Sequence, residues 1–143
     1  MASIAAERVH SAITTAWTVA EQRDYIERMN AREAIHVAVD DVIIGLQTLE
    51  QGPFESMAHV AQIGTFLTAS ARGRGVGKRV FEATKAFAIS NGYRKFSIQV
   101  RGSNAHAQAF YSSLGFVECG RLTAHVCIDG VFDDEVLMEL SLK

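Results

Sequence analysis

One short segment of the chain, RGRGVGKR at residues 72–79, alternates glycines with basic residues. An apolar stretch, Ile63–Ala69, precedes it, and a helical pattern, Val80–Ile89, follows it. Glycine lets the backbone turn sharply and brings its N–H groups close to a ligand. At the start of a helix these groups lack intrahelical acceptors and lie at the positive end of the helix dipole. Such a loop is suited to phosphate groups, and the basic side chains add charge for them.

Two common nucleotide-binding motifs do not fit this segment. A P-loop requires glycine at position 72 and serine or threonine at position 79, and the chain has Arg72 and Arg79 there. A dinucleotide-binding motif that starts at Gly73 requires a third small residue at position 78, which is Lys78. A different phosphate loop and a glycine-rich surface loop with solvated charges both remain open at this point.

The sequence around this loop alternates helical and extended patterns. The alanine-rich first sixteen residues predict a helix. Thr18 and Glu21 form a capping-box pattern that predicts a second helix to about Met29, which Asn30 would end in a left-handed conformation. After the loop, the spacing of Val76, Val80, Ala83 and Phe87 predicts one helical face that packs on a sheet. A short helix is expected over residues 104–114.

The predicted strands come in two hairpins with further strands between them. Asp40-Asp41 is a tight-turn signal, and Asp129-Gly130 is a stronger one. Gly64 inside a strand suggests a bulge or a close backbone approach. The strands are expected at residues 34–39, 42–49, 59–68, 96–101, 122–128 and 135–142. Helices that alternate with strands, and hairpins at both ends, predict an α/β fold with a mixed, mostly antiparallel sheet and helices on both faces.

Composition limits the classes of protein to consider. The 143 residues, 48% of them hydrophobic, predict one globular domain over residues 1–143. The net charge of −2 argues against general binding to nucleic acid or to an anionic membrane. The chain has no run of 18 apolar residues and no signal-peptide pattern, so we expect a cytoplasmic protein. Cys119 and Cys127 predict buried thiols in a reducing compartment, and with His125 they are too few for a zinc site.

A second motif, further along the chain, suggests a function for the glycine loop. The pattern Arg72-x-x-Gly75-x-Gly77 is followed about thirty residues later by Asn104 and by the segment FYSSLGF at residues 110–116. In this order, with a helix and a strand between them, the two pieces resemble the GCN5-related N-acetyltransferase (GNAT) superfamily. The resemblance extends from Val60 to Leu142.

The resemblance implies an enzyme that uses acetyl-CoA as co-substrate. Backbone N–H groups of residues 74–78 would hold the pyrophosphate, and the loop's basic side chains would neutralise charge. The strand before the loop would bond the pantetheine arm, and one of its N–H groups would polarise the thioester carbonyl. Asn104 would contact the arm, and Tyr111 would protonate the departing thiolate as the catalytic general acid. The cofactor-binding residues that the resemblance implies are Phe66, Leu67, Thr68, Arg72, Gly73, Arg74, Gly75, Val76, Gly77, Lys78 and Asn104.

The acceptor side is less specified. The family implies a primary amine of a small molecule or peptide, which attacks the thioester directly through a tetrahedral intermediate. His59, Glu50 and Glu55 are candidate bases, and the two glutamates read more simply as solvated loop charges. An acidic cluster around the last hairpin would attract a cationic amine, although a solvated turn is an equally good interpretation. The cluster comprises Asp129, Asp133, Asp134 and Glu135.

The chain departs from the family at its start. Met1–Ala6 has no strand pattern where the family has its first strand. We expect a second subunit, in a homodimer, or a neighbouring segment to cover the sheet edge that this would expose. The alternative function is a non-catalytic acyl-CoA-binding or regulatory module on the same fold. A nucleic-acid-binding module is a third class, disfavoured by the net charge and by the lack of aromatics between the basic residues.

Overall fold

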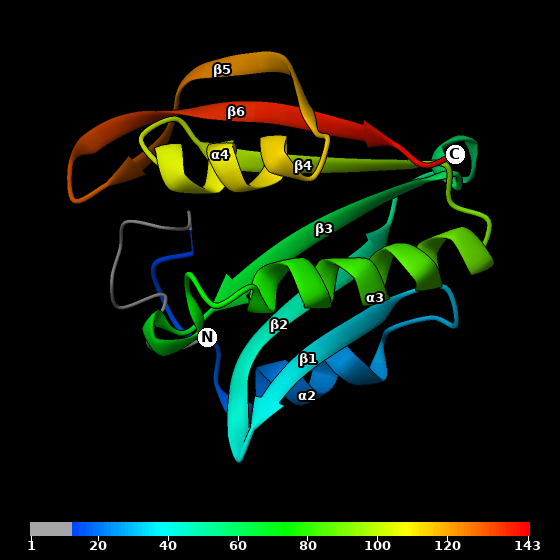
Figure 1. Cartoon of the computed structure of the whole chain (residues 1–143). Coiled ribbons are helices and arrows are strands. Elements are labelled where there is room, and N and C mark those ends of the chain that lie inside the picture. The colour runs from blue at the N-terminus through cyan, green and yellow to red at the C-terminus, as the bar shows by residue number, and fades with distance from the viewer. Residues whose placement is uncertain (1–12) are drawn as a thin grey trace. The chain divides into compact units, whose positions relative to one another are not determined.

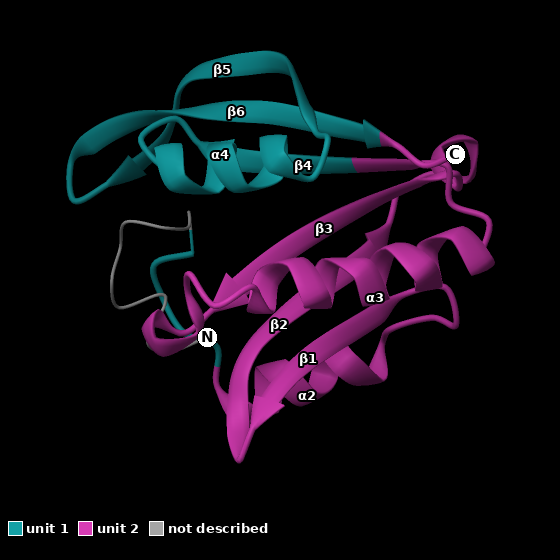
Figure 2. Ribbon diagram, viewed as in Figure 1, with its two compact units in different colours: residues 1–17, 97–140 teal, residues 18–96, 141–143 magenta. Residues whose placement is uncertain are grey.

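The computed structural model describes residues 13–143, and their helices and strands alternate along the chain (Figure 1). The chain divides into two compact units (Figure 2). We call residues 18–96 with 141–143 the loop unit, and residues 97–140 with 13–17 the hairpin unit. The predicted first helix and the missing first strand fall mostly on residues 1–12, outside the described part, and residues 13–17 form neither helix nor strand.

The loop unit contains three antiparallel strands in the order β1-β2-β3, which are Ala34–Asp40, Val42–Gln51 and Val60–Leu67. The predicted hairpin turn is confirmed, because Asp40 pairs with Val42 and Asp41 has a φ of 58°. The β1–β2 register shifts between Ala38 and Val39, which leaves Ile44 as the extra residue on β2. Gly64 is not a bulge, because the β2–β3 register is continuous. A Cβ there would lie 3.1 Å from Thr48 Oγ1 and 3.2 Å from Cε2 of Phe66, so side-chain atoms, rather than the closely approaching backbone that was predicted, limit the space at this position.

Helix α3 (Val76–Ser90) packs on this sheet through a buried stripe. Val76 and Val80 form a core cluster with Ile44 and Ala71, and Ala38 and Leu67 pack against it. The predicted face is partly wrong. Ala83 is exposed, and Thr84 is buried in its place, since the inner stripe follows the i, i+4 row from Val76 through Val80.

Helix α2 (Val19–Glu27) lies on the opposite face of the sheet from α3 (Figure 1). Its Tyr25 hydroxyl donates to Glu50 on β2, whereas the β1 side chain of His36 meets Thr84 of α3. The capping box of Thr18 and Glu21 is confirmed. The predicted end is wrong: the helix stops at Glu27, and Asn30 is not left-handed. The Asn30 side chain instead accepts the N–H of Arg32 at 2.8 Å, which turns the chain into β1.

The hairpin unit contains strands in the order β4-β6-β5 and one helix. Strand β4 (Lys95–Arg101) enters it from the loop unit, α4 (Ala105–Ser113) follows, and β5 (Val117–Ile128) pairs with β6 (Val131–Ser141). The predicted Asp129-Gly130 turn is confirmed, with φ values of 53° and 78°. Strand β5 begins five residues before the predicted start and is irregular between Leu122 and Val126, where Ala124 has a φ of 49°.

The two cysteines correct another prediction. Cys119 and Cys127 are free thiols, and both are exposed rather than buried. They lie on β5, whose pairing with β6 leaves much of its length open to solvent. Residues 13–143 contain no group of three or more His, Cys, Asp or Glu side chains that could hold a metal ion. None of the helices described is long and apolar enough to span a membrane.

Candidate functional site

The loop between β3 and α3 requires glycine for its backbone conformation. Gly73 has a φ of 70° and Gly75 has a φ of 74°, both in the left-handed region that disfavours other residues. A Cβ at either position would meet no atom within 4 Å. Backbone conformation, rather than lack of space for a side chain, therefore favours glycine at these two positions. The two turns are needed to bring the chain from the end of β3 into the first turn of α3.

The first turn of α3 has backbone N–H groups without intrahelical partners. Gly75 is its N-cap residue, and no side chain caps it. The N–H of Arg79 is the first to bond within the helix, to the carbonyl of Gly75 at 3.2 Å. The N–H groups of Val76, Gly77 and Lys78 therefore lie at the positive end of a 15-residue helix without an intrahelical acceptor. This arrangement is suited to binding an anion.

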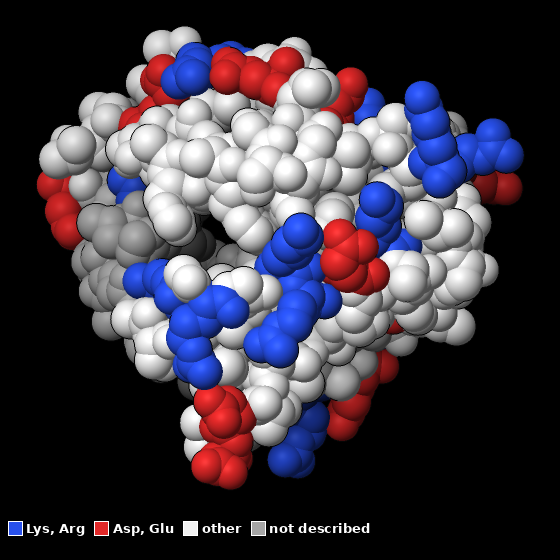
Figure 3. Space-filling model, viewed as in Figure 1, with Lys and Arg blue, Asp and Glu red and all other residues white. Residues whose placement is uncertain are grey.

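The basic side chains of the loop have different roles. The Arg72 guanidinium donates to the carbonyl of Leu67 at 3.0 Å and so fastens the loop to the end of β3. Arg74 lies 3.5 Å from Asp40 at the tip of the first hairpin, but both side chains are more than half exposed and the pair adds little stability. Lys78 and Arg79 are exposed on the first turn of α3. Basic side chains gather over α3 and the loop, with few acidic groups among them (Figure 3).

The end of β3 presents one N–H group away from β2. Thr68 donates its N–H to Ile44 at 2.9 Å, and at the other end of the pair Gly52 donates to Val60 at 3.1 Å. Because hydrogen-bonded positions alternate in an antiparallel pair, the N–H groups of Phe66 and Thr68 point toward β2. The N–H of Leu67 points the other way. Of the three backbone positions predicted for the pantetheine arm, Leu67 is the one that directs its N–H away from β2.

Asn104 and Tyr111 belong to the hairpin unit. Asn104 is the N-cap of α4, and its side-chain oxygen accepts the N–H of Ala107 at 3.1 Å. Tyr111 is 6% exposed and is the one fully buried residue of α4. Its ring makes edge-to-face contacts with Phe110 and Phe116, at centroid distances of 5.2 and 5.3 Å. These contacts hold the phenol in a fixed orientation, which a general acid requires.

Among the candidate bases, Glu50 is the one whose surroundings differ most from the predicted solvated loop. It lies on β2, is half-buried, and accepts the hydroxyl of Tyr25, so it is not a solvated loop charge. Burial, followed by the bond to Glu50, raises the pKa of Tyr25 well above its usual range. Glu55 is exposed, which agrees with its interpretation as a solvated charge, and His59 is exposed as well. Tyr25 could not be identified from the sequence, because only the fold brings it against Glu50, 25 residues further along the chain.

The acidic cluster is largely engaged in bonds within the hairpin unit. Asp133 pairs with Arg101 at 2.9 Å and accepts both the hydroxyl and the N–H of Ser103. The Ser103 hydroxyl lowers the pKa of Asp133 most; burial opposes this effect, and Arg101 adds to it. Asp134 accepts the N–H of Ala124 at 2.9 Å. The cluster is therefore more than a solvated turn.

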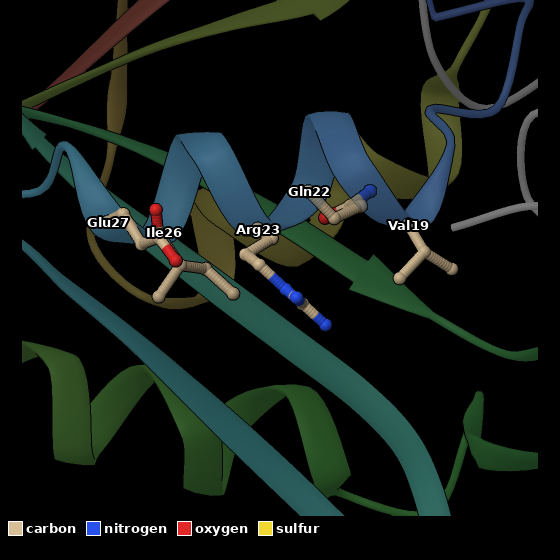
Figure 4. A pocket seen from close by; sticks show the side chains of 5 residues that line it. All are labelled: Val19, Gln22, Arg23, Ile26 and Glu27. Atoms are coloured by element: carbon tan, nitrogen blue, oxygen red, sulfur yellow. The ribbon is translucent and has the colours of Figure 1, made fainter.

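A separate pocket lies along α2, and its lining includes none of the site residues predicted from the sequence (Figure 4). One helix face lines it, and no residue of the glycine loop contributes. Its lining residues are Val19, Gln22, Arg23, Ile26 and Glu27.

Comparison with known proteins relates these features to one family. Over residues 5–116 the sequence matches the model of the acetyltransferase (GNAT) family. No match is found among curated proteins. Many solved structures are similar.

Three of these structures share 21% identity with the chain. An N-acetyltransferase from Staphylococcus aureus has a TM-score of 0.85, with 93% of this chain and 82% of that chain covered. A phosphinothricin acetyltransferase from Sinorhizobium meliloti, in complex with acetyl-CoA, has a TM-score of 0.86, with 94% and 75% covered. A ribosomal-protein-alanine N-acetyltransferase from Brucella melitensis has a TM-score of 0.82, with 90% and 81% covered.

Likeness at this level of identity concerns the fold, and it confirms the predicted α/β class, with its mostly antiparallel strands and with helices on both faces of the sheet. The family model covers well over half of the chain. The two motifs from which the resemblance was inferred lie inside that match, at residues 72–77 and 104–116. The chain therefore belongs to the acetyltransferase (GNAT) family.

Proposed function

We propose that this protein transfers the acetyl group of acetyl-CoA to a primary amine of a small molecule or peptide. The observation that carries the proposal is the loop before α3, where left-handed Gly73 and Gly75 lead into an uncapped first helical turn. Membership of the acetyltransferase family supports it, as does the similar fold of an enzyme crystallised with acetyl-CoA. We further propose that residues 1–143 act as one domain, in the cytoplasm.

In the proposed reaction, backbone groups bind and polarise the thioester. The N–H groups of residues 74–78 hold the pyrophosphate, and Lys78 supplies charge beside it. Leu67 directs its N–H away from β2 and donates it to the thioester carbonyl as negative charge develops there. Loss of one such donor typically raises the barrier by about 3 kcal/mol.

Side chains of the hairpin unit complete the proposed reaction. The amine attacks the carbonyl directly in its neutral form, a tetrahedral intermediate forms, and the proton that the nitrogen gives up passes to water. The carbon–sulfur bond then breaks, and Tyr111 gives its proton to the departing thiolate. A free tyrosine has a pKa of about 10, so it is protonated at neutral pH and able to donate. Asn104 contacts the pantetheine arm with the part of its amide that does not cap α4.

The acceptor is proposed only as a class. The solved structures of similar fold carry names with two different acceptors, phosphinothricin and the alanine of a ribosomal protein. Both present an amine, and this common feature supports the proposed class. We assign no general base, since Glu50 is bonded to Tyr25 and His59 is exposed at the start of β3.

A thiol-release assay with acetyl-CoA tests the proposal. The panel of acceptors includes amino acids, polyamines, aminoglycosides and peptide N-termini. We expect release with at least one amine in the wild type, and little release in Tyr111→Phe although that variant still binds acetyl-CoA. Binding of acetyl-CoA by both proteins, with no release for any amine, supports the non-catalytic module instead. Absence of acetyl-CoA binding in calorimetry at millimolar concentration refutes both functions.

A further inference from the structure

Hydrogen bonds and close contacts attach the turn between β4 and α4 to strand β6. This turn, residues 102–104, carries Asn104 at its end and leads into the helix of Tyr111. The N–H of Gly102 donates to the carbonyl of Asp134 at 2.8 Å. A Cβ at Gly102 would lie 3.1 Å from the Cβ of Asp134 and 3.2 Å from Oδ1 of Asp133. The turn is therefore in close contact with β6 of the last hairpin.

Asp133 is the centre of this contact. Its carboxylate receives three hydrogen bonds: from Nε of Arg101 at 2.9 Å, from the N–H of Ser103 at 3.1 Å and from the Ser103 hydroxyl at 2.5 Å. The side chains of Arg101 and Asp133 are only 11% and 12% exposed. Water screens a pair in this setting less than it screens a surface pair. The carboxylate thus bonds residues on both sides of Gly102 and fixes the path of the turn.

The fixed turn determines where α4 begins. The side chain of Gln108, in the helix, donates to the carbonyls of Arg101 and Gly102 at 3.1 and 2.9 Å. The Asn104 N–H donates to the carbonyl of Arg101 at 3.0 Å. Strand β4, the turn and the first turn of α4 therefore form one hydrogen-bonded unit, and Asp133 attaches it to the last hairpin. A shift of the turn would carry Asn104 and Tyr111 with it.

We propose that Asp133, acting through Arg101 and Ser103, is a positioning residue that sets the placement of Asn104 and Tyr111 for acetyl transfer. The inference rests on the proposed function. The carboxylate does not touch substrate: it holds the turn from which both groups extend. Because misplacement of a reacting group by about 1 Å can lower a rate by about a hundredfold, a small displacement of the turn is sufficient to be measured.

The test uses variants of the full-length protein that change the bonds to Asp133 stepwise. Ser103→Ala removes the hydroxyl and keeps the backbone N–H, whereas Ser103→Thr keeps a hydroxyl. Asp133→Asn keeps the shape and removes the charge. The matched control is His125→Gln, which changes an exposed side chain of the same hairpin whose Nε2 lies 3.7 Å from Glu135 and which does not contact the turn at Gly102. For each variant we would measure the melting temperature, the Kd of acetyl-CoA, and kcat and KM at a temperature well below melting.

Positioning predicts a loss of kcat in fully folded protein. At saturating acetyl-CoA we expect Ser103→Ala and Asp133→Asn to lower kcat by about tenfold or more. We expect Ser103→Thr to recover most of the loss and His125→Gln to match the wild type. Wild-type kcat in Asp133→Asn, or an equal loss in His125→Gln, overturns the inference while leaving the proposed function intact. An inactive wild type would instead count against the proposed function itself.

Discussion

Gly75→Ala should lower both the stability of the fold and the affinity for acetyl-CoA, because Gly75 forms the left-handed turn before α3. Gly75 has a φ of 74°, and a Cβ there would meet no atom within 4 Å. Alanine at position 75 would therefore strain the backbone without causing a steric clash. This strain destabilises the folded protein by about 1–2 kcal/mol, the cost of an L-residue in the left-handed region. For a chain of this size that cost lowers the melting temperature by about 3–8 °C.

The same substitution should weaken acetyl-CoA binding. Alanine relieves its strain by rotating the peptide that leads into Val76, which turns N–H groups of the first helical turn away from the pyrophosphate. Loss of one hydrogen bond to a charged group costs about 1.5–3 kcal/mol, or about a ten- to hundredfold rise in Kd. Gly75→Asn should be milder in both respects, because asparagine tolerates the left-handed region better than alanine.

Gly130→Ala is the matched control for this prediction. Gly130 lies in the β5–β6 turn with a φ of 78°, and a Cβ there also meets nothing within 4 Å. The two variants should lose similar stability in thermal melts, whereas calorimetry should show weaker acetyl-CoA binding for Gly75→Ala alone. Equal and unchanged affinities in both variants would refute the role given to the loop. Equal losses of affinity would show that stability, rather than loop geometry, controls binding.

Three further predictions concern single side chains. Tyr111→Phe keeps the ring contacts and should keep its melting temperature and Kd, but it should lower kcat about 10²- to 10⁴-fold in the thiol-release assay. Arg72→Gln loses the bond to the Leu67 carbonyl, so the KM for acetyl-CoA should rise more than kcat falls in steady-state kinetics. Burial lowers the pKa of His36, whose ring nitrogen meets the Thr84 hydroxyl at 3.1 Å. Protonation therefore favours the unfolded state. Stability should fall as the pH drops below about 6.5. His36→Gln should show a smaller fall between pH 7.5 and 5.5 in urea unfolding; an equal fall would exclude His36 as its source.

The sequence predicted the elements whose signals are local. The capping box at Thr18, the turn at Asp40-Asp41 and the turn at Asp129-Gly130 each depend on a few adjacent residues, and all three are confirmed. Where the outcome depends on tertiary contact, prediction was weaker. Ala83 and Thr84 are both compatible with the α3 pattern, and only packing on β1 and β2 decides that Thr84 is the buried one.

The same distinction applies to the candidate site. The glycines of the loop have a local requirement for positive φ, so their positions could be identified from sequence alone. The bonds of Asp133 join β6 to a turn 30 residues earlier, and the bond of Tyr25 joins α2 to β2. No local pattern marks such pairs. The sequence therefore predicted an acidic cluster near Asp133 but not that Asp133 would bond to Arg101 and Ser103.

The proposed chemistry depends mostly on backbone groups, so it requires few particular side chains. The N–H groups of the α3 first turn and the N–H of Leu67 would be present with almost any side chains, provided that the loop glycines keep their conformation. A fold shared at 21% identity can therefore keep a thioester site while few residue types are held in common. Recognition of the acceptor depends instead on side chains, which differ freely at that identity. It follows that acceptor identity has to be measured on this protein, whereas use of the acetyl donor can be argued from its main chain.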